Sequence, residues 1–581
     1  MANGFGSLYV GASGLQSSQN GLNVISNNLA NIGTEGYVRQ RVFYEDRHYT
    51  SFQNAAVSTQ QTGLGVNIGD VIHARDAFLD RAYRSENGRS AFYAAGYDAT
   101  SEIETQLQET DGEAFRDAIT DLYSAFAEYA KDPSNTTYQN LVIQKSELFL
   151  SRASGVYDGL AKYQSTINVK IKNDVTRINE LGKEIQELNK AIQRIEAGKV
   201  ETAMELRDQR DKDLDELSKL ADIEYSESAD GIVKVRLEGT EFLDEVHVYQ
   251  LGLKEDNLTG FLTPYWTHLS NPARDQYYPA FSTETIDPAV RNDVGEVKSL
   301  LLARGDHNAN YFDLENLTSD QYSKGISNSV VMNSQAELDR LVHTIMTGVN
   351  DLLAPNTTYG AVTGSTGTVT GKDSMGNVVL IGPDTKILDV DKCCYGESKK
   401  LPPEELYTRT GCDRYKQVTV TDAAGNDQLL YVYNEEDSSD LSTCYTLKDV
   451  TVNQELKSFP TELPHLTKND GVAYSMADDI YQLWESSGYT LNPSDITPTS
   501  FTGFYTKYIG ELATQGSIYK TTSESLTSTT ATIESNRQAV IGVSSDEELT
   551  NMIKFQNAYN ASSRYINVVS EMIEYLLSSV S

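Results

Sequence analysis

Residues 7–37, SLYVGASGLQSSQNGLNVISNNLANIGTEGY, hold the strongest structural signal in this chain of 581 residues. Leucine recurs there every seven positions, and a small residue or an isoleucine follows each leucine three positions later. This is the a/d spacing of a coiled coil. Five glycines precede residue 22 and no charged side chain precedes Glu35, so the isolated helix is predicted to be weak. The predicted seam consists of Leu8, Leu15, Leu22, Ile25, Leu29 and Ile32.

The C-terminal segment carries a matching pattern. Apolar residues spaced by sevens run from Met552 and again from Phe555, and only four charged side chains occur between 549 and 581. Ser545 followed by Glu548 is typical of a capping box that begins a helix. We therefore expect both ends to be helices that pair along apolar seams, and the sequence leaves open whether they pair within one chain or between neighbours. The seam residues predicted at this end are Met552, Phe555, Tyr559, Ile566, Val569, Ile573 and Leu576.

Between the two ends the pattern changes twice. Residues 160–195 hold a third heptad series with charged residues outside it, as in a solvated coiled coil. After Ile223 the alternation of apolar and polar residues has period two, which indicates strands. The prediction is an elongated α+β multidomain protein with a helical coiled-coil base formed by both termini and β-rich domains inserted in the middle. The expected domains are a terminal coiled-coil assembly domain (1–35 with 541–581), a mainly helical domain (36–223 with 466–540, and a helix near 335–353), a β-rich domain (224–330) and an inserted β-rich domain that contains cysteine (355–465).

Composition excludes several functional classes. The formal net charge of −35 argues against nucleic acid as a partner. No run reaches the roughly 20 apolar residues of a membrane-spanning helix, so no membrane partner is expected. The histidines are scattered, with no metal-binding spacing. DQRDKDLDEL, residues 208–217, interleaves acids with Arg and Lys, which predicts an exposed helix. We therefore predict no enzyme activity, no catalytic residues, no metal and no cofactor.

All four cysteines fall in the predicted insert. Cys393 and Cys394 are adjacent and Cys412 and Cys444 are isolated, which does not match the paired spacing of zinc ligands. One or two disulfides would staple a small β domain in an oxidising location. Three full pairings are open to four cysteines, and the sequence does not rank them. Reduced, buried cysteines are the alternative.

The run NVISNNLANIGTEGY, residues 23–37, has an Asn-Asn-Leu-Ala-Asn core followed by a Thr-x-Gly-aromatic turn. It resembles the N-terminal element of the axial proteins of the bacterial flagellum, the family of rod, hook and hook-associated proteins. Residues 63–84, 208–223 and 542–566 are similar to the hook-associated members of that family. The resemblance covers the helical ends and base, and it does not extend to 355–465. The residues that carry the motif are Asn27, Asn28, Asn31, Thr34, Gly36 and Tyr37.

The resemblance implies a structural role in the flagellum, joining hook to filament through the terminal helices. It implies a homo-oligomeric ring with hook protein below, hook-associated protein 3 above, and an export chaperone on the C-terminal helix inside the cell. It also implies an extracellular protein exported by the flagellar machinery, and no Lys or Arg occurs before Arg39 to form a cleavable signal peptide. The alternative is a surface adhesin or a displayed enzyme that the flagellum carries by means of the 355–465 insert.

Overall fold

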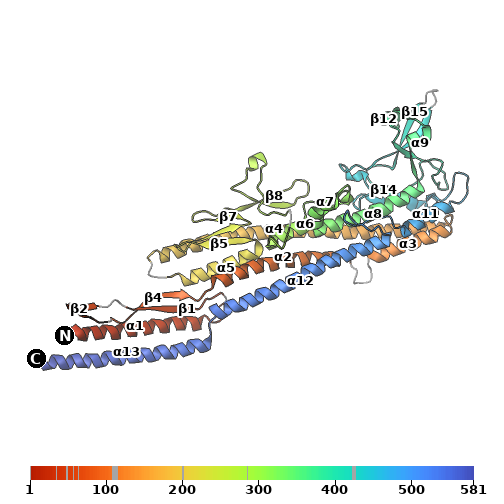
Figure 1. Ribbon diagram of the computed structural model, residues 1–581. Coiled ribbons are helices and arrows are strands. Elements are labelled where there is room, and N and C mark those ends of the chain that lie inside the picture. The colour runs from red at the N-terminus through yellow and green to blue at the C-terminus, as the bar shows by residue number, and fades with distance from the viewer. Residues whose placement is uncertain are drawn as a thin grey trace.

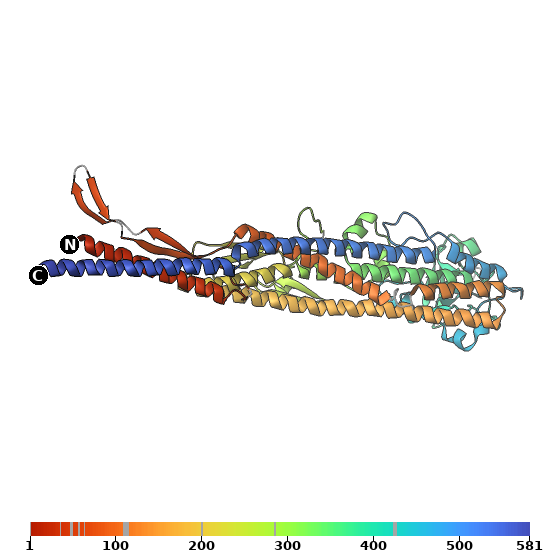
Figure 2. The same ribbon diagram turned by 90° about the horizontal axis from the view of Figure 1, so that it is seen from below.

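The protein is elongated, and its two termini lie together at one end (Figures 1 and 2). The structure is a computed structural model that describes residues 2–34, 36–46, 50–55, 58–62, 64–107, 115–198, 202–283, 286–421 and 427–580. The chain runs outward along helices, forms β-containing lobes, and returns along two long helices (Figure 1). The α+β multidomain architecture predicted from the sequence is confirmed.

The base of the molecule consists of the first and last helices. α1 (Ala2–Ala30) and α13 (Ser545–Val580) lie side by side, and we call them the terminal pair (Figure 1). Two antiparallel β pairs follow α1, and the first of these pairs packs against it. Their strands are β1 (Gln40–Asp46) with β4 (Val66–His73), and β2 (Thr50–Ala55) with β3 (Ser58–Thr62).

Long helices form the body of the molecule, which we call the rod. One continuous hydrophobic core runs through it. The polar segment 132–135 separates α3 from α4, and the Asn135 side chain caps α4 by accepting a hydrogen bond from the Thr137 backbone N–H. The rod helices are α2 (Ala77–Leu107), α3 (Phe115–Lys131), α4 (Thr136–Glu196), α5 (Met204–Leu220), α8 (Val330–Leu353) and α12 (Phe501–Ile541).

The heptad pattern at 160–195 lies on α4. The apolar face of α4 does not pack against one coiled-coil helix but against several elements, including a β-sheet. Ile171, Ile178 and Ile185 are buried as predicted, whereas Ile195 is 41% exposed. Near that end Asn189 is buried instead, and its side-chain amide donates to the Val233 carbonyl and accepts from the Val233 N–H. A β-sheet therefore covers the end of α4, which shifts the buried face away from the heptad.

The first β lobe packs on the C-terminal half of α4. A three-stranded antiparallel sheet, β5 (Ile223–Glu227), β6 (Val233–Leu237) and β7 (Thr240–Leu243), is followed by the pair β8 (Leu251–Glu255) and β9 (Leu262–Trp266). Phe242 and Trp266 are fully buried and place this lobe in the core of the rod. Short helices complete the lobe and connect it to α8: η1 (Pro272–Arg274), α6 (Glu296–Arg304), η2 (Tyr311–Leu314), α7 (Ser319–Lys324) and η3 (Ile326–Asn328).

The second β region has two parts. An antiparallel six-stranded sheet with its own small core projects at the far end of the molecule (Figure 1). Its order is β10 (Asn356–Thr358), β13 (Lys386–Leu388), β16 (Asp427–Tyr433), β15 (Tyr415–Thr421), β11 (Val369–Asp373) and β12 (Val378–Ile381).

The other part of the second β region returns to the rod. β14 (Tyr407–Arg409) pairs with β17 (Val450–Val452), and the Tyr407 hydroxyl lies 2.9 Å from the Ser146 hydroxyl of α4. The predicted insert 355–465 is thus only partly separate, because about half of it shares the core of the rod. The remaining short helices are α9 (Tyr359–Thr363), η4 (Leu441–Thr443), α10 (Gln454–Ser458), η5 (Pro460–Glu462) and α11 (Tyr474–Glu485).

Candidate assembly interface at the chain ends

The terminal pair is antiparallel, and its glycines allow the two helices to approach closely. A Cβ atom added at Gly11 would lie 2.6 Å from Cγ1 of Ile566, and one added at Gly21 would lie 3.1 Å from the Phe555 ring. Both distances are shorter than ordinary side-chain contacts. The glycines that weaken α1 as an isolated helix are therefore the residues that let α13 pack against it.

The predicted seam residues lie mainly between these helices. Ile25 and Val569 are buried, and the other predicted residues within the contact are half-buried. Two predicted seam residues lie outside the contact between the two helices. Ile32 lies beyond the end of α1 and is 51% exposed, and Leu576 near the end of α13 is 52% exposed. The pairing lies within one chain, which the sequence had left open. The half-buried seam residues are Leu8, Leu15, Leu22, Leu29, Met552, Phe555, Tyr559, Ile566 and Ile573.

A second apolar stripe on α13 was missed by the sequence reasoning. Tyr565, Val568, Met572 and Tyr575 follow one another at spacings of three and four, and they are 45%, 48%, 64% and 79% exposed. We call these four residues the outer stripe. Its signal in the sequence is a second heptad series, offset from the first. α13 therefore has an apolar face that α1 does not cover.

Asn28 of the family motif joins three segments at the end of α1. It is 1% exposed, its amide donates to the Gln40 carbonyl at 3.0 Å, and its amide oxygen accepts from the Tyr37 hydroxyl at 2.9 Å and from the Gln40 N–H at 3.0 Å. Its amide also lies 3.3 Å from the Glu548 carboxylate on α13. A buried amide that makes all of these bonds fixes the exit of the chain from α1 into β1.

The other motif residues form the turn that ends α1. The Asn31 side chain donates to the Asn27 carbonyl and accepts from the Thr34 hydroxyl, which closes the last turn of the helix. Gly36 has a φ of +84°, a left-handed conformation that favours glycine. Burial raises the pKa of Tyr37 to about 12, so its hydroxyl remains a donor to Asn28. The motif is thus a structural turn.

Glu548 and Arg39 lock the beginning of α13 to this turn. The Arg39 guanidinium lies 2.7 Å from the buried Glu548 carboxylate and 2.7 Å from Glu547. The predicted capping box was wrong, because Ser544, one residue earlier, accepts the hydrogen bond from the Glu547 backbone N–H. The Glu548 side chain turns instead toward Arg39 and Asn28.

Helix α5 holds the next contact, and the sequence reasoning misread it as solvated. Asp208, Arg210 and Asp213 are nine-tenths or more buried. The Asp208 carboxylate accepts the backbone N–H of Val38 at 3.0 Å and lies 3.4 Å from Nδ1 of His73. Burial raises the pKa of Asp208 to about 7 and lowers that of His73 to about 4. An acid is therefore buried where the terminal pair meets the rod.

The same helix forms a buried ionic network with α2 and α12. Arg537 of α12 donates to Asp80 of α2 and to Asp215 of α5, each at 2.9 Å. Arg84 of α2 donates to Asp215 at 2.6 Å and to Asp211 at 3.0 Å. Alternating charges looked like a solvated face in the sequence, but their partners come from other helices. The network fixes these three helices just above the terminal pair.

The four cysteines are free thiols in the structure, so the disulfide staple expected from the sequence is not formed there. Cys393, Cys394 and Cys444 are buried and Cys412 is half-buried. Burial raises the pKa of the Cys394 thiol to about 12, which keeps it protonated and unreactive. The alternative of reduced, buried cysteines describes three of the four.

The arrangement at the chain ends defines a class of protein: an elongated molecule whose two ends pair and present an uncovered apolar stripe for assembly. Within the described ranges, no helix combines the length and apolarity needed to cross a membrane. The same residues contain no cluster of three or more metal-binding side chains.

Comparisons with known proteins agree with this class. Residues 100–368 match the family described as "Flagellar hook-associated protein FlgK helical domain". Residues 8–37 match "Flagella basal body rod protein", and residues 539–579 match "Flagellar basal body rod FlgEFG protein C-terminal". Two of the three matches thus fall on the terminal pair.

Individual relatives carry the same description. Flagellar hook-associated protein 1 of Bacillus subtilis is 24% identical over 574 residues, covering 97% of this chain and 96% of the relative. The Escherichia coli protein of that name is 26% identical over 226 residues, covering 39% and 40%. A solved flagellar hook junction protein FlgK from Burkholderia pseudomallei aligns at a TM-score of 0.46 and 14% identity, over 79% of this chain and 100% of that one. The chain is thus similar to hook-associated protein 1 over nearly its whole length, and its two ends are similar to flagellar rod proteins.

Proposed function

We propose that this protein joins the flagellar hook to the filament and that it assembles through the terminal pair. The single observation that carries the assembly mechanism is the outer stripe. It adjoins a seam most of whose residues are only half-buried, so both surfaces of α13 have room for further helices. Burying one such side chain contributes about 1.5–3 kcal/mol, so four together would stabilise an assembled state substantially.

The uncharged surface of the pair supports the same proposal. Burying an unpaired charge against a neighbouring subunit is costly, whereas Asn, Ser and Gln can exchange hydrogen bonds with it. Tyr9, Gln16, Gln19 and Asn23 of α1 face outward and carry no formal charge. These properties suit helices that are surrounded by copies of themselves in the wall of a tube.

The partners follow from the family. The relatives are axial components of the flagellum, alongside rod and hook proteins. For this chain we propose a homo-oligomeric ring with hook protein on one side and hook-associated protein 3 on the other. An export chaperone would cover α13 before assembly, because its outer stripe is otherwise exposed to water.

Flagellar hook-associated proteins are exported components of the extracellular flagellum. For this chain we propose export without a cleavable signal peptide. The family is structural, so no enzyme activity is proposed for the 355–465 insert. The match to the helical-domain model ends at residue 368, and nothing on the described residues of the projecting sheet favours an adhesin.

The experiment is complementation of a deletion strain with a variant of the outer stripe, Val568→Asp with Met572→Asp. We expect hooks without filaments and filament protein shed into the medium, because two charges would be buried between subunits. The matched control is Asn560→Asp with Asn567→Asp, which adds the same charge on the polar side of α13, where both residues are exposed. Normal filaments from the outer-stripe variant would refute assembly through this surface.

A further inference from the structure

Lys298 of α6 is the one lysine, among the residues that the structure describes, that is almost fully buried. Its side chain is 4% exposed, and its ammonium lies 2.6 Å from the carboxylate of Glu238, which is 8% exposed. In the other described ion pairs of lysines, the lysine side chain is at least 25% exposed. Removing both charges of a pair from water is costly. Nothing in the proposed function uses this pair.

Glu238 lies in the tight turn between β6 and β7, in a conformation that glutamate rarely adopts. Its φ is +49° and that of Gly239 is +75°, and a type I′ turn requires positive φ at both central residues. Glycine, asparagine and aspartate are the usual residues at the first of these positions, because the left-handed region costs other residues free energy. The turn therefore holds Glu238 at a cost, and the carboxylate that it holds contacts Lys298.

Asp222, the residue before β5, adds a second acid to the pair. Its backbone N–H donates to Oε1 of Glu238 at 3.3 Å, and its carbonyl accepts the backbone N–H of Glu238 at 2.9 Å. Burial raises the pKa of the Asp222 carboxyl, and the nearby Lys298 ammonium opposes that rise. Burial also raises the pKa of Glu238. One buried amine thus contacts one carboxyl and has another beside it.

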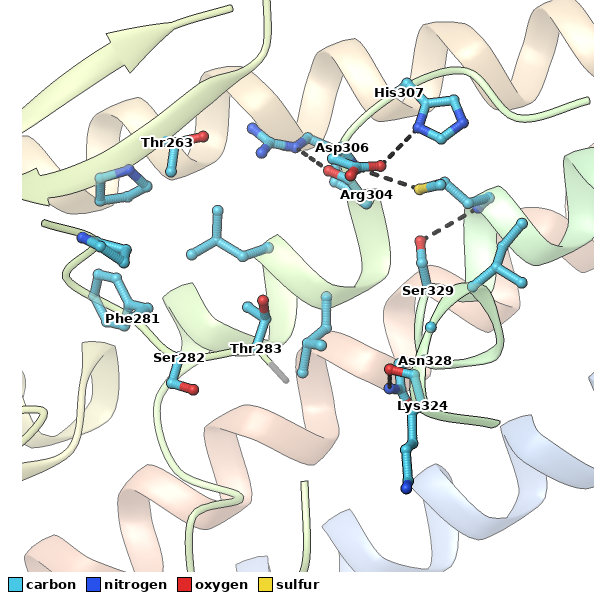
Figure 3. A pocket seen from close by; sticks show the side chains of 18 of the residues that line it. Thr263, Phe281, Ser282, Thr283, Arg304, Asp306, His307, Lys324, Asn328 and Ser329 are labelled. Carbon is cyan, nitrogen blue, oxygen red and sulfur yellow. Dashed lines mark hydrogen bonds and ion pairs between the residues drawn. The ribbon is translucent and has the colours of Figure 1, made fainter. Parts of the chain in front are cut away.

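Water is largely excluded from these three groups. Each of them directly follows a core residue that is completely buried, and these core residues are Ala221, Leu237 and Val297. Glu238 also lines a cavity of about 910 Å³, which Figure 3 shows with Thr263 at one side and Ser329 at the other. The carboxyl therefore has a space beside it that a released water molecule can enter.

We propose that Lys298 and Glu238 condense spontaneously to an intramolecular isopeptide bond. A proton passes from the ammonium to the carboxylate, which leaves a neutral amine and a neutral carboxyl group. Nζ of Lys298 attacks Cδ of Glu238, so that a C–N bond forms and one C–O bond breaks. The hydroxyl group leaves with a proton from the nitrogen. The products are one amide and one molecule of water, and the reaction needs neither an oxidant nor a cofactor.

The surroundings that make the ion pair costly favour this reaction. Burial favours the neutral forms of both groups, and a desolvated amine is a nucleophile. The contact keeps the reacting groups together. The backbone N–H of Asp222 already donates to Oε1, on which negative charge develops in the tetrahedral intermediate. The Asp222 carboxyl moves the proton from the nitrogen to the leaving oxygen.

The bond ties the first β lobe to the rod. It joins the β6–β7 turn to α6 and closes a loop from residue 238 to residue 298, which restricts the unfolded chain and so stabilises the folded one. All of the reacting groups belong to one chain, so the bond forms in the monomer and does not depend on assembly.

The test is denaturing mass spectrometry of the full chain together with a tryptic peptide map. We expect an intact mass that is lower than the mass of the sequence by one water molecule. The map should contain a branched peptide that joins the segment with Glu238 to the segment with Lys298. Lys507 is the internal control, because it lies 2.7 Å from Asp495 but is 31% exposed, and trypsin should cleave after it as after a free lysine. An intact mass equal to that of the sequence, with linear peptides at both positions, overturns the proposal.

Lys298→Arg separates the covalent bond from the ion pair. Arginine keeps the charge but does not form this amide, so the variant should have its full mass. A loss of water that persists in Lys298→Arg would lie elsewhere in the chain and would overturn the assignment. The proposal stays testable if this variant does not fold, because the wild-type mass and peptide map are measured directly.

Asp222→Asn tests the proton transfer. This variant keeps the backbone N–H and removes the acid, so most of the freshly purified chain should have the full mass and should lose water only slowly on storage. Circular dichroism checks that the fold is kept. A cross-linked fraction equal to that of the wild type would overturn the role of Asp222.

Discussion

The terminal pair and the rod both consist of long helices, but they differ in how far their apolar side chains are buried and in how their charged side chains are paired. In the rod, Ile171, Ile178 and Ile185 are completely buried and Arg537 is paired with two acids inside one chain. In the terminal pair most seam residues are half-buried, and the outer stripe is exposed. The difference fits the proposal that the rod is complete as a monomer, whereas the ends are completed by partners.

The largest effect is expected from breaking the seam itself. Leu22→Asp with Ile566→Asp places a charge on each helix of the terminal pair, and we expect filament assembly to be abolished. The rod should stay folded, since its core does not include these residues. Complementation and far-UV circular dichroism measure the two outcomes. Filaments of normal length would show that the seam is not needed for assembly. Unfolding of the rod in this variant would show that the two regions do not fold independently.

Hydrogen exchange of the dilute monomer would sharpen the comparison. We expect residues 2–30 and 545–580 to exchange many times faster than α4, because α1 is rich in glycine and both helices are only half-buried at their contact. The amides of Ile171 and Ile178 should show the protection of the global unfolding reaction. Equal protection of the ends and the rod would show that the terminal pair is already complete in the monomer.

A smaller effect, confined to the rod, is expected from its ionic network. Arg537→Gln removes the partner that Asp80 and Asp215 share, while Asp80 keeps Arg75 and Asp215 keeps Arg84, so unfolding in urea should show a loss of about 1–3 kcal/mol. The matched control is Arg236→Gln, because Arg236 is exposed and its contact with Glu224 is worth at most about 1 kcal/mol. Equal losses would mean that the buried network does not hold the rod together.

The smallest effect is expected in the pH dependence of stability, which arises from Asp208 and His73 where the terminal pair meets the rod. Burial raises the pKa of Asp208 from 3.8 to about 7, so its contribution is present below pH 3.8 and is lost as the pH rises to 7. His73 has the opposite sign, since its pKa falls from 6.5 to about 4 and its contribution is lost as the pH falls through that range. The two dependences largely cancel in the native protein.

Asp208→Asn removes one of the two dependences. Relative to the wild-type protein, the stability of this variant should fall by roughly 2 kcal/mol between pH 6.5 and 4, because the dependence of Asp208 no longer opposes that of His73. The matched variant His73→Gln should instead lose stability as the pH rises from 4 to 7. Urea unfolding at several pH values measures both slopes, and parallel curves for the two variants would contradict the assignment.

Much of the interface was predictable because its signals are local. Heptad spacing located Ile25 and Val569, and the Asn-Asn-Leu-Ala-Asn core identified the family and the turn at Gly36. The missed features depend on distant segments. Glu548 was assigned to a cap of its own helix, although it contacts Asn28 and Arg39 from the other end of the chain.

The charged helix α5 shows why such errors arise. Its alternating acids and bases are the same pattern that a solvated helix carries, and the pattern does not record which side chains have partners elsewhere. Asp211 and Asp215 meet arginines of α2 and α12, which are more than 100 residues away.

The sequence by itself determined the seams, the turn after α1, the α+β order and the family, because helix periodicity and turn chemistry depend on neighbours within a few residues. Only the tertiary structure decided that α1 and α13 pair within one chain and which apolar face remains uncovered. It also decided where each charge is buried. These outcomes depend on contacts between residues far apart in the chain, and such contacts form only when the whole core packs.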